Sequence, residues 1–371
     1  MDECEKTVEL LSAGRPRPVL MIPVRRCGSH AIRLRLNFNP AFYSPYPLHT
    51  VDFMPLVRLY GNLADDDAYF QLIVDLIGLQ NANMVRWEGM AFDPVALFET
   101  LRDKPRSVYS VVWEMLWQAG EAHGAHVVMD KSLDSVHSAG ELVSLFDDIL
   151  FLNVVRDPRA QVASMNRAII HDFDTLLNAQ IWVRAHDAAR QLMEMHPERV
   201  LTIRFEDFLA NPEATLQRVC AFLGLEFLPE MLDISRSDEA RRLSKLSALW
   251  ESNASAPITA NADKFRKLLG DEELRIVETL AGEHMDFYGY ERMTAGKSRI
   301  TDELIQHAVR RSEERQRRAW EELKAKNPRD CCLRRFRAEY LSMIKSRLLR
   351  NAYPVARTPA EGETARQRMA G

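Results

Sequence analysis

Four short apolar runs, separated by stretches with helical spacing, predict the fold class. The runs cover residues 19–23, 126–129, 149–155 and 200–205. Continuous apolar runs of this length are typical of strands that are buried on both faces. Strands that alternate with helices form parallel sheets with right-handed crossovers. The pattern therefore predicts an α/β fold in which helices flank a central parallel sheet.

Two of the predicted helices, both after the last apolar run, have clear ends. Asn211 and Pro212 supply a helix cap and a first helical position, and Gly224 follows the last apolar position. Gly270 and Asp271 precede another helix, whose apolar positions indicate packing in a core.

The segment that begins in the first run passes from strand to turn to helix. It reads IPVRRCGSHAIRLRL over residues 22–36, with Gly28 and Ser29 at the turn and Arg25 and Arg26 beside it. Backbone N–H groups at a helix start have no intrahelical acceptor, so they favour a bound phosphate or sulfate. An ordinary connection with solvated arginines has the same pattern, so this loop alone leaves both interpretations open.

A second junction favours the anion site. Residues 149–167 read ILFLNVVRDPRAQVASMNR: Arg156 ends the strand, Asp157 caps a helix, and Ser164 lies on that helix eight positions after Arg156. In open α/β sheets, ligands bind where the carboxyl ends of strands meet helix starts. Arg26, Arg156 and Asp157 are all expected at such places.

At these residues the chain resembles the sulfotransferases that use 3′-phosphoadenosine 5′-phosphosulfate (PAPS), in particular bacterial, carbohydrate-directed members. That superfamily has a loop of the form Pro-x-Ser-Gly-Ser/Thr-Thr with Lys or Arg at x, and a later strand that ends in Arg-Asp-Pro with a Ser eight positions after the Arg. Residues 204–227, RFEDFLANPEATLQRVCAFLGLEF, are similar to a third family segment, and the resemblance covers about residues 17–292 with gaps. It implies a P-loop-like three-layer fold.

The resemblance also implies an activity. The expected enzyme transfers a sulfuryl group from PAPS to a hydroxyl of a carbohydrate or other acceptor by in-line displacement, releases 3′-phosphoadenosine 5′-phosphate (PAP), and needs no metal. The long connection over residues 37–125 is similar in position to the part that builds the acceptor pocket in this superfamily.

For the donor's 5′ end, the resemblance implies that Arg26 binds the phosphosulfate and neutralises charge on the bridging oxygen. The expected binding residues of this loop are Arg25, Arg26, Cys27, Gly28, Ser29, His30 and Ala31. Cys27 replaces the usual Ser, and is either a small filler or a thiol of lowered pKa. His30 replaces the usual Thr, and its ring either donates to the phosphate or packs against the sheet.

For the donor's 3′ end, the resemblance assigns the 3′-phosphate to Arg156 and Ser164, and ring packing to Phe205. Residues 261–269 resemble a late basic segment that closes over the nucleotide, and its candidates are Lys264, Arg266 and Lys267. Arg159 is predicted to be a surface residue of the first helical turn.

The general base has several candidates. A base must reach the acceptor's proton with a usable pKa, which a His or a carboxylate can do. His49 and Asp52 lie at the distance after the donor loop that the resemblance favours, and Glu88 and Asp130 are alternatives. Lys131 either assists the sulfate or the acceptor, or is an exposed lysine at a strand end.

Composition limits the class of protein and the cell compartment that we expect. The 371 residues are 46% hydrophobic and 27% charged, with a net charge of −4, so a globular domain is expected and any anion site must be local. Five cysteines without a CxxC pair favour a reducing compartment and argue against structural zinc. No long apolar segment is present, so we expect a cytoplasmic protein.

The C-terminal part lies beyond the resemblance. Residues 301–326 have the charge pattern of a solvated helix, and residues 333–348 form a basic amphipathic helix. This helix packs on its own domain, docks a partner or second subunit, or attaches the protein peripherally to a membrane. The predicted division is an N-terminal segment 1–16, a sulfotransferase domain 17–293, a basic helical extension 294–352 and a disordered tail 353–371.

Three other functions stay open at this point. The altered Cys27 and His30 positions suggest a non-catalytic nucleotide-binding relative. A P-loop kinase would need a GxxxxGK[ST] motif, which the sequence lacks. A nucleic-acid-binding protein is disfavoured because no recognised module accompanies the basic helix.

Overall fold

A computed structural model describes residues 12, 14–255 and 263–352. The predicted disordered tail, most of the N-terminal segment, and Asn261 and Ala262 of the late basic segment lie outside the described residues.

The described part of the chain contains a five-stranded, fully parallel sheet with the order β2-β3-β1-β4-β5. The strands are β1 Arg17–Ile22, β2 Phe42–Tyr43, β3 Val127–Asp130, β4 Leu150–Val155 and β5 Val200–Arg204. All four predicted strands are confirmed. The sequence did not reveal β2, because two residues are too few to show a period.

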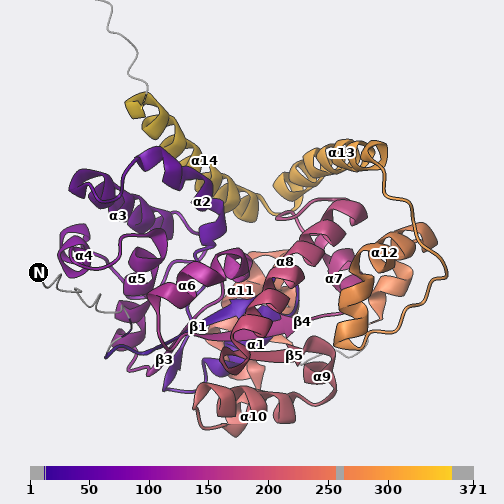
Figure 1. Ribbon diagram of the computed structural model, residues 1–371, viewed down its shortest axis with the longest axis horizontal. Helices are drawn as coiled ribbons and strands as arrows, with labels where there is room; N and C mark the ends of the chain where they lie inside the picture. The colour runs from indigo at the N-terminus through magenta and orange to yellow at the C-terminus, as the bar shows by residue number, and fades with distance from the viewer. Residues whose placement is uncertain (1–11, 13, 256–262, 353–371) are drawn as a thin grey trace, which may run out of the picture.

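Alternate residues of β1 enter two different cores, which explains the layered architecture. Val19 and Met21 pack in a core with Ile32 and Leu36 of α1, whereas Leu20 packs in a core with Trp113 of α5. Because successive side chains of a strand point to opposite faces, a strand that is apolar at every position must be covered on both faces. The predicted three-layer fold is confirmed (Figure 1).

The helices have the following bounds: α1 Ser29–Leu36, α2 Met54–Val57, α3 Asp66–Asn81, α4 Pro94–Leu101, α5 Val108–Ala122, α6 Ala139–Leu145, α7 Pro158–Met165, α8 Thr175–Met195, α9 Phe205–Ala210, α10 Pro212–Leu223, α11 Asp238–Leu246, α12 Asp271–Tyr288, α13 Asp302–Lys326 and α14 Pro328–Ala352. Both helices with clear sequence ends are present as α10 and α12. Asn211 accepts the N–H of Ala214 in α10, as its capping role predicts.

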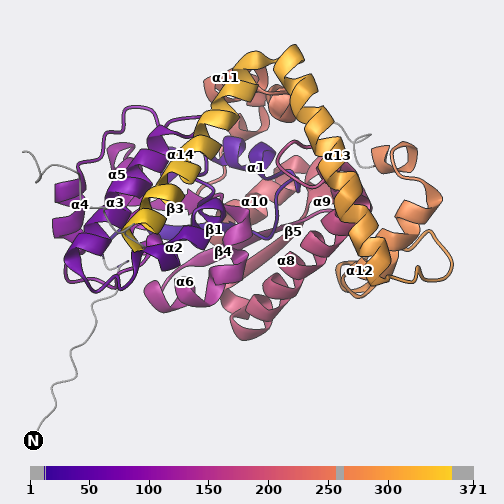
Figure 2. The same ribbon diagram turned by 90° about the horizontal axis from the view of Figure 1, so that it is seen from above.

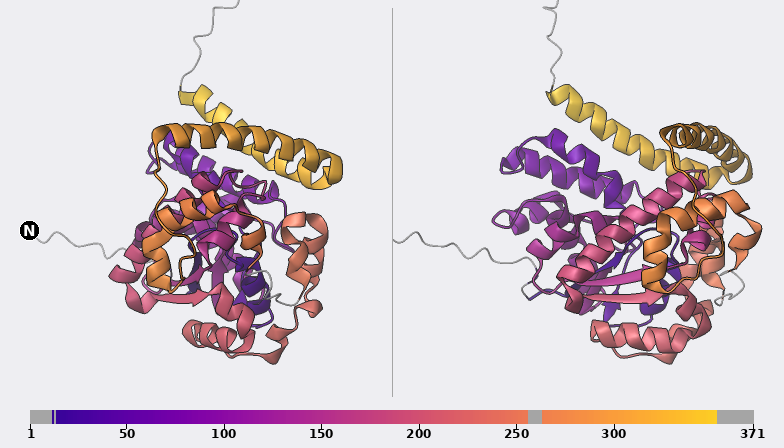
Figure 3. Two further views of the ribbon diagram at one scale, coloured as in Figure 1. Left: turned by 90° about the vertical axis from the view of Figure 1, so that its right-hand side faces the viewer. Right: turned by 45° about the vertical axis from the view of Figure 1, so that its right-hand side comes forward.

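The C-terminal extension consists of α13 and α14, which meet beside α11 (Figures 2 and 3). Asn327, between the two helices, donates a hydrogen bond to the carbonyl of Leu246 at the end of α11. Ile344 and Leu348 of α14 are buried in the larger core, whereas Phe336 is 52% exposed. The amphipathic helix therefore packs on its own chain. A domain boundary at residue 293 stays a prediction.

Candidate functional site

Three strand ends bring together the residues on which the sequence motifs depend. The strands β3, β1 and β4 are neighbours in the sheet and run parallel, so their carboxyl ends share one edge. Arg26 follows β1, Lys131 follows β3 and Arg156 follows β4. Side chains far apart in sequence thus converge where an open α/β sheet binds its ligands.

The loop between β1 and α1 has an unusual backbone. Arg26 and Gly28 have φ angles of 75° and 93°, and Gly28 is the residue immediately before α1. Positive φ is costly for residues with a Cβ atom and costs glycine little. A Cβ at Gly28 would also lie 2.1 Å from Cε2 of Phe205. Both conformation and space therefore require glycine here.

The replacement Gly28→Ala is expected to lower the free energy of unfolding by about 1–3 kcal/mol, because the new methyl group adds backbone strain and displaces Phe205. Urea denaturation followed by circular dichroism measures this loss. The exposed Gly89 is also at positive φ, but a Cβ added there would have no atom within 4 Å, so Gly89→Ala separates the two causes. An equal loss in both variants would mean that the contact with Phe205 contributes nothing.

A cavity of about 540 Å³, here called cavity A, lies beside this loop and β4. Nine of the residues predicted to bind the donor line it: Arg26, Gly28, Ser29, His30, Ala31, Arg156, Ser164, Phe205 and Lys264. Cavity A therefore brings together both donor motifs and one basic residue, Lys264, of the late basic segment.

Hydrogen bonds connect the two donor motifs directly. Nε of Arg26 donates to Oγ of Ser164 over 3.1 Å, and Nη1 of Arg156 donates to the carbonyl of Arg26 over 3.0 Å. The Arg156 guanidinium also lies 5.2 Å from the ring centre of Phe205. Burial, and next the charge of Arg156, lower the pKa of Arg26 to about 10, so Arg26 stays positive at neutral pH.

Other predicted donor residues lie elsewhere. Cys27 is fully buried in the core of α1 and α10, and burial raises the pKa of its thiol to about 11, so the alternative of a reactive thiol is wrong. Arg266 is exposed and pairs with Asp263, and Lys267 is exposed; neither lines cavity A. Arg25 pairs with Asp134 over 2.7 Å and faces a different cavity.

Arg159 is buried, so its prediction as a surface residue is wrong. It is 5% exposed, and its guanidinium binds Asp157 over 2.7 Å and Glu278 over 2.8 Å. Glu278 belongs to α12, so this arginine connects α7 to a helix more than a hundred residues further along the chain.

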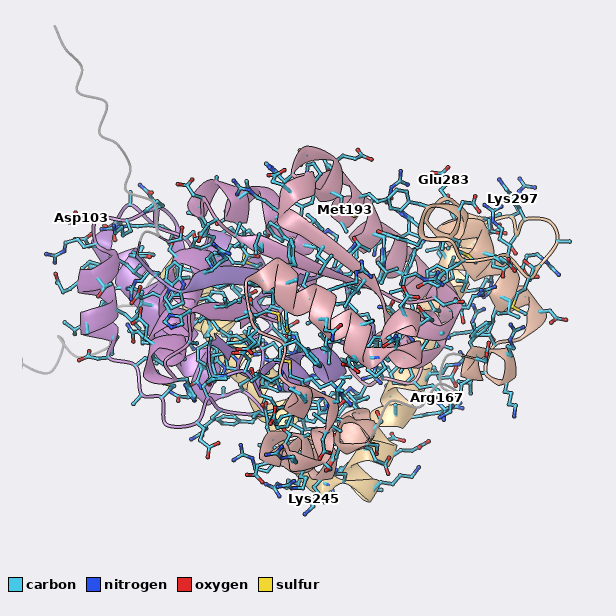
Figure 4. The ribbon with its side chains drawn as sticks, turned by 90° about the horizontal axis from the view of Figure 1, so that it is seen from below. Asp103, Arg167, Met193, Lys245, Glu283 and Lys297 are labelled. Atoms are coloured by element: carbon cyan, nitrogen blue, oxygen red, sulfur yellow. The ribbon has the colours of Figure 1, made fainter. Side chains whose placement is uncertain are left out.

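Sequence reasoning missed Arg35 of α1, which also lines cavity A. It is 1% exposed, and its Nη1 donates to the carbonyl of Ala31 over 2.8 Å, whereas its Nε and Nη2 have no hydrogen-bond partner. Burial lowers the pKa of Arg35 to about 10, so it too is a cation. The available signal was an arginine inside the apolar helix IRLRL. Arg167, labelled in Figure 4, is an exposed arginine that also lines cavity A.

A second cavity of about 460 Å³, here called cavity B, adjoins cavity A. Arg26, Ser29, His30 and Leu249 line both cavities. The remaining residues of cavity B that the sequence singled out are Arg25, His49, Asp52 and Lys131. Three aromatic side chains, Tyr46, Trp250 and Trp320, form part of its wall.

The base candidates differ sharply in their surroundings. His49 lines cavity B with its Nδ1 buried and without a hydrogen-bond partner, and burial holds its pKa well below the usual range. Asp52 accepts a 2.9 Å hydrogen bond from Arg337 of α14. Asp130 is buried outside the cavity lining, and burial raises its pKa to about 6, whereas Glu88 is exposed and pairs with Arg242.

Lys131 is not an exposed strand-end lysine, because only 2% of it is exposed. Its Nζ lies 3.4 Å from Oγ of Ser29, at the start of α1. Burial, and next the charge of Arg33, lower the pKa of Lys131 to about 7. The ammonium therefore lies where the two cavities meet.

Fold and site together define a parallel α/β protein with two adjoining cavities at the carboxyl edge of its sheet. A model of the sulfotransferase family matches residues 18–229, more than half of the chain. The chain belongs to the sulfotransferase family.

Solved sulfotransferases resemble this chain at low identity. The sulfotransferase domain of the Synechococcus PCC 7002 olefin synthase is 22% identical, with 72% of this chain and 95% of that one covered and a TM-score of 0.49. The sulfotransferase domain of the curacin biosynthetic pathway is 19% identical, with 75% of this chain and 99% of that one covered and a TM-score of 0.48. A Mycobacterium avium sulfotransferase is 15% identical, with 76% of this chain and 79% of that one covered and a TM-score of 0.39.

Among the residues that the structure describes, no helix has the length and apolarity required to span a bilayer.

Proposed function

We propose that this enzyme transfers a sulfuryl group from PAPS to a hydroxyl of a carbohydrate or other acceptor and releases PAP. The observation that carries the proposal is that cavity A and cavity B meet at Arg26, Ser29 and His30. A donor in cavity A would present its sulfuryl group to an acceptor in cavity B across this junction. Holding both reactants in line removes much of the entropic barrier to transfer.

In the proposed reaction the acceptor oxygen forms a bond to sulfur as the bond from sulfur to the bridging oxygen breaks. Such transfers, like phosphoryl transfers, depend on positioning and on stabilisation of charge more than on a covalent intermediate. Arg26 would neutralise the charge that develops on the bridging oxygen, while the backbone N–H groups of Ser29 and His30 bind the 5′-phosphate. The N–H of Ala31 already donates to the carbonyl of Gly28 over 3.0 Å, so Ala31 lines cavity A without offering this group to the phosphate. Arg156 and Ser164 would bind the 3′-phosphate, with Arg35 as a further cation of the same cavity.

We assign the base to His49. Its ring faces cavity B and is neutral at pH 7, because burial lowers its pKa. A neutral imidazole can accept the proton of the acceptor hydroxyl. Asp52 is disfavoured because its carboxylate already accepts a hydrogen bond from Arg337, so Asp52 acts by positioning that arginine.

The experiment that tests the function combines binding and turnover. Calorimetry measures PAP binding to the purified 371-residue chain, and transfer of radioactive sulfur from PAPS is followed over a panel of sugars, phenols and alcohols. PAP binding with transfer supports the proposal. PAP binding without transfer to any acceptor, unaffected by loss of Arg26, would favour a non-catalytic relative, and binding of ATP with magnesium in place of PAP would favour a kinase.

Lys131 gives a prediction about pH. Its ammonium is the active form if it stabilises the sulfuryl group, and a pKa of about 7 means that this form disappears as pH rises. We expect kcat/KM for PAPS to fall about tenfold per pH unit well above pH 7. In Lys131→Arg this alkaline fall should vanish, because a guanidinium keeps its proton. A fall that persists in Lys131→Arg would assign it to another group.

Further contacts of α14 stay predictions, as do the cytoplasmic location and a homodimer. Phe336 and Met343 of α14 are each 52% exposed, and the same helix carries the exposed Lys345 and Arg350. A second subunit or a membrane surface could cover them, and sedimentation with and without anionic vesicles distinguishes these partners.

A further inference from the structure

The side chains that line cavity B are mostly positive. Arg25, Arg26, Lys131, Arg334 and Arg337 are its described basic residues, and Asp52 is its described carboxylate. Two carboxylates outside the lining also pair with them, since Asp134 binds Arg25 over 2.7 Å and Asp330 binds Arg334 over 2.8 Å. Arg25, Arg334 and Arg337 each pair with one of these three carboxylates, which leaves the positive charge of Arg26 and, when it is protonated, of Lys131, whose pKa is about 7.

The histidines of cavity B do not offset this excess. Burial lowers the pKa of both His30 and His49, and the nearest further causes are basic groups, Lys131 for His30 and Arg25 for His49. Both rings are neutral at pH 7. A concave site that carries excess positive charge favours an anion more strongly than a flat exposed surface does.

The donor accounts for only some of the basic residues that line cavity B. Arg26 and Lys131 lie at the junction, where the sulfuryl group of a donor in cavity A would be. Arg334 and Arg337 belong to α14 and line cavity B without lining cavity A. Each of them is paired with a carboxylate, Asp330 or Asp52, so they offer an acceptor the N–H donors of a cationic group and not an unpaired charge.

Arg337 has an unused donor. Its Nη2 donates to the carbonyls of Leu48 and His49 over 3.0 and 3.2 Å and to Asp52 over 2.9 Å. Its Nη1 is buried and has no hydrogen-bond partner, although the residue is only 8% exposed. Buried donors are nearly always satisfied, so an acceptor atom from a ligand is expected here.

We propose that the acceptor carries an acidic group in addition to its hydroxyl, and that Arg337 and Arg334 of α14 bind this acidic group. A carboxylate and a phosphate ester share the chemistry required, and the aromatic and aliphatic walls of cavity B pack against the remainder of the molecule. The inference rests on the proposed function, because it treats cavity B as the acceptor site.

This assignment places acceptor selection outside the part of the chain that the family model matches. The match ends at residue 229, whereas α13 and α14 occupy residues 302–352. The helices contribute Trp320, Arg334, Arg337, Ala338 and Leu341 to cavity B. The extension is therefore a wall of the acceptor site as well as a packed part of the fold.

Binding to the enzyme–PAP complex tests the inference with matched probes. One set is p-nitrophenyl glucoside, the corresponding glucuronide and the corresponding glucose 6-phosphate; the other is 4-hydroxyphenylacetamide and 4-hydroxyphenylacetate. We expect at least one acidic probe to bind at least tenfold more tightly than its neutral partner, and the carboxylate and phosphate arms show which acid is preferred. Equal affinities within every set, or no binding of any probe to a complex that holds PAP, would overturn the inference. Failure of PAP itself to bind would instead count against the proposed function.

Two substitutions at Ala338 isolate the charge effect without removing an anchoring contact. Ala338 is exposed on α14 and lines cavity B, so both Glu and Gln can be accommodated on the helix surface. Relative to Ala338→Gln, Ala338→Glu should weaken the acidic probe at least tenfold and change the neutral probe less than twofold. Arg337→Gln should weaken the acidic probe similarly, with PAP affinity as the check that the variant is folded.

Lys345→Gln is the control, because this exposed lysine of α14 does not line cavity B. It should leave all affinities within twofold. If Ala338→Glu and Ala338→Gln have the same effect on acidic and neutral probes, the acidic group is not bound at this wall and the inference fails.

Discussion

Replacing Arg26 by alanine is expected to lower kcat for sulfuryl transfer by at least about 10²–10³-fold, the effect seen when one preorganised donor to a developing charge is removed. Arg26 is the basic residue that lines both cavities, and it stays protonated despite its lowered pKa of about 10. The bond that breaks leaves negative charge on the bridging oxygen, and a half-buried guanidinium stabilises that charge more effectively than water does.

The measurement is transfer of radioactive sulfur from saturating PAPS to an acceptor found in the panel. PAP affinity should fall less than kcat, since Arg156, Ser164 and Lys264 also line cavity A. Arg218→Ala, which removes an exposed arginine of α10, is the matched control and should retain full activity. A kcat for Arg26→Ala within fivefold of the unmodified enzyme would remove Arg26 from the chemistry.

The sheet could be predicted from the sequence because the signal for each of its longer strands lies within the strand itself. Each long strand is an apolar run, and the flanking layers follow from burial on both faces. The convergence of Arg26 with Arg156 was likewise predictable, since neighbouring parallel strands place their carboxyl ends at one edge. The strand β2 was not predictable, because Phe42 and Tyr43 pair with β3 through its backbone in a stretch without periodicity.

The unpredicted parts of the site depend on partners that are distant in sequence. Arg159 has the local pattern of a solvated first-turn arginine, and only the position of Glu278 on α12 shows that it is buried. Arg337 contacts Asp52, 285 positions away in the sequence. An amphipathic pattern predicts that a helix has an apolar face but does not predict which part of the fold that face packs against. The choice between His49 and Asp52 as base depended on that contact, so it could not be made from the sequence.

The buried cluster around Arg159 gives the second large prediction. Replacing Arg159 by methionine removes the cation that binds Asp157 over 2.7 Å and Glu278 over 2.8 Å. Asp157 is 8% exposed and Glu278 is 4% exposed, so the variant leaves buried carboxylates without their cation. We expect the free energy of unfolding to fall by about 3–5 kcal/mol, the cost of breaking a buried ion pair from one side.

Urea denaturation of four proteins measures this loss and assigns its cause. The unmodified chain, Arg159→Met, Glu278→Gln and the double variant form a cycle, and a coupling energy of at least about 1 kcal/mol is expected because the two side chains are in contact. Arg275→Met on α12 removes an arginine from a largely exposed pair with Glu272 and should cost less than about 0.5 kcal/mol.

PAP binding distinguishes a role of Arg159 in the stability of the fold from a role in binding the ligand. Arg159 does not line cavity A, so saturating PAP should raise the midpoint of unfolding of Arg159→Met by as much as it raises that of the unmodified chain. A normal unfolding free energy with a lost response to PAP would instead make Arg159 a ligand residue. The expected pattern, low stability with an intact response, would show that this arginine acts by fixing α7, the helix that carries Ser164, against α12.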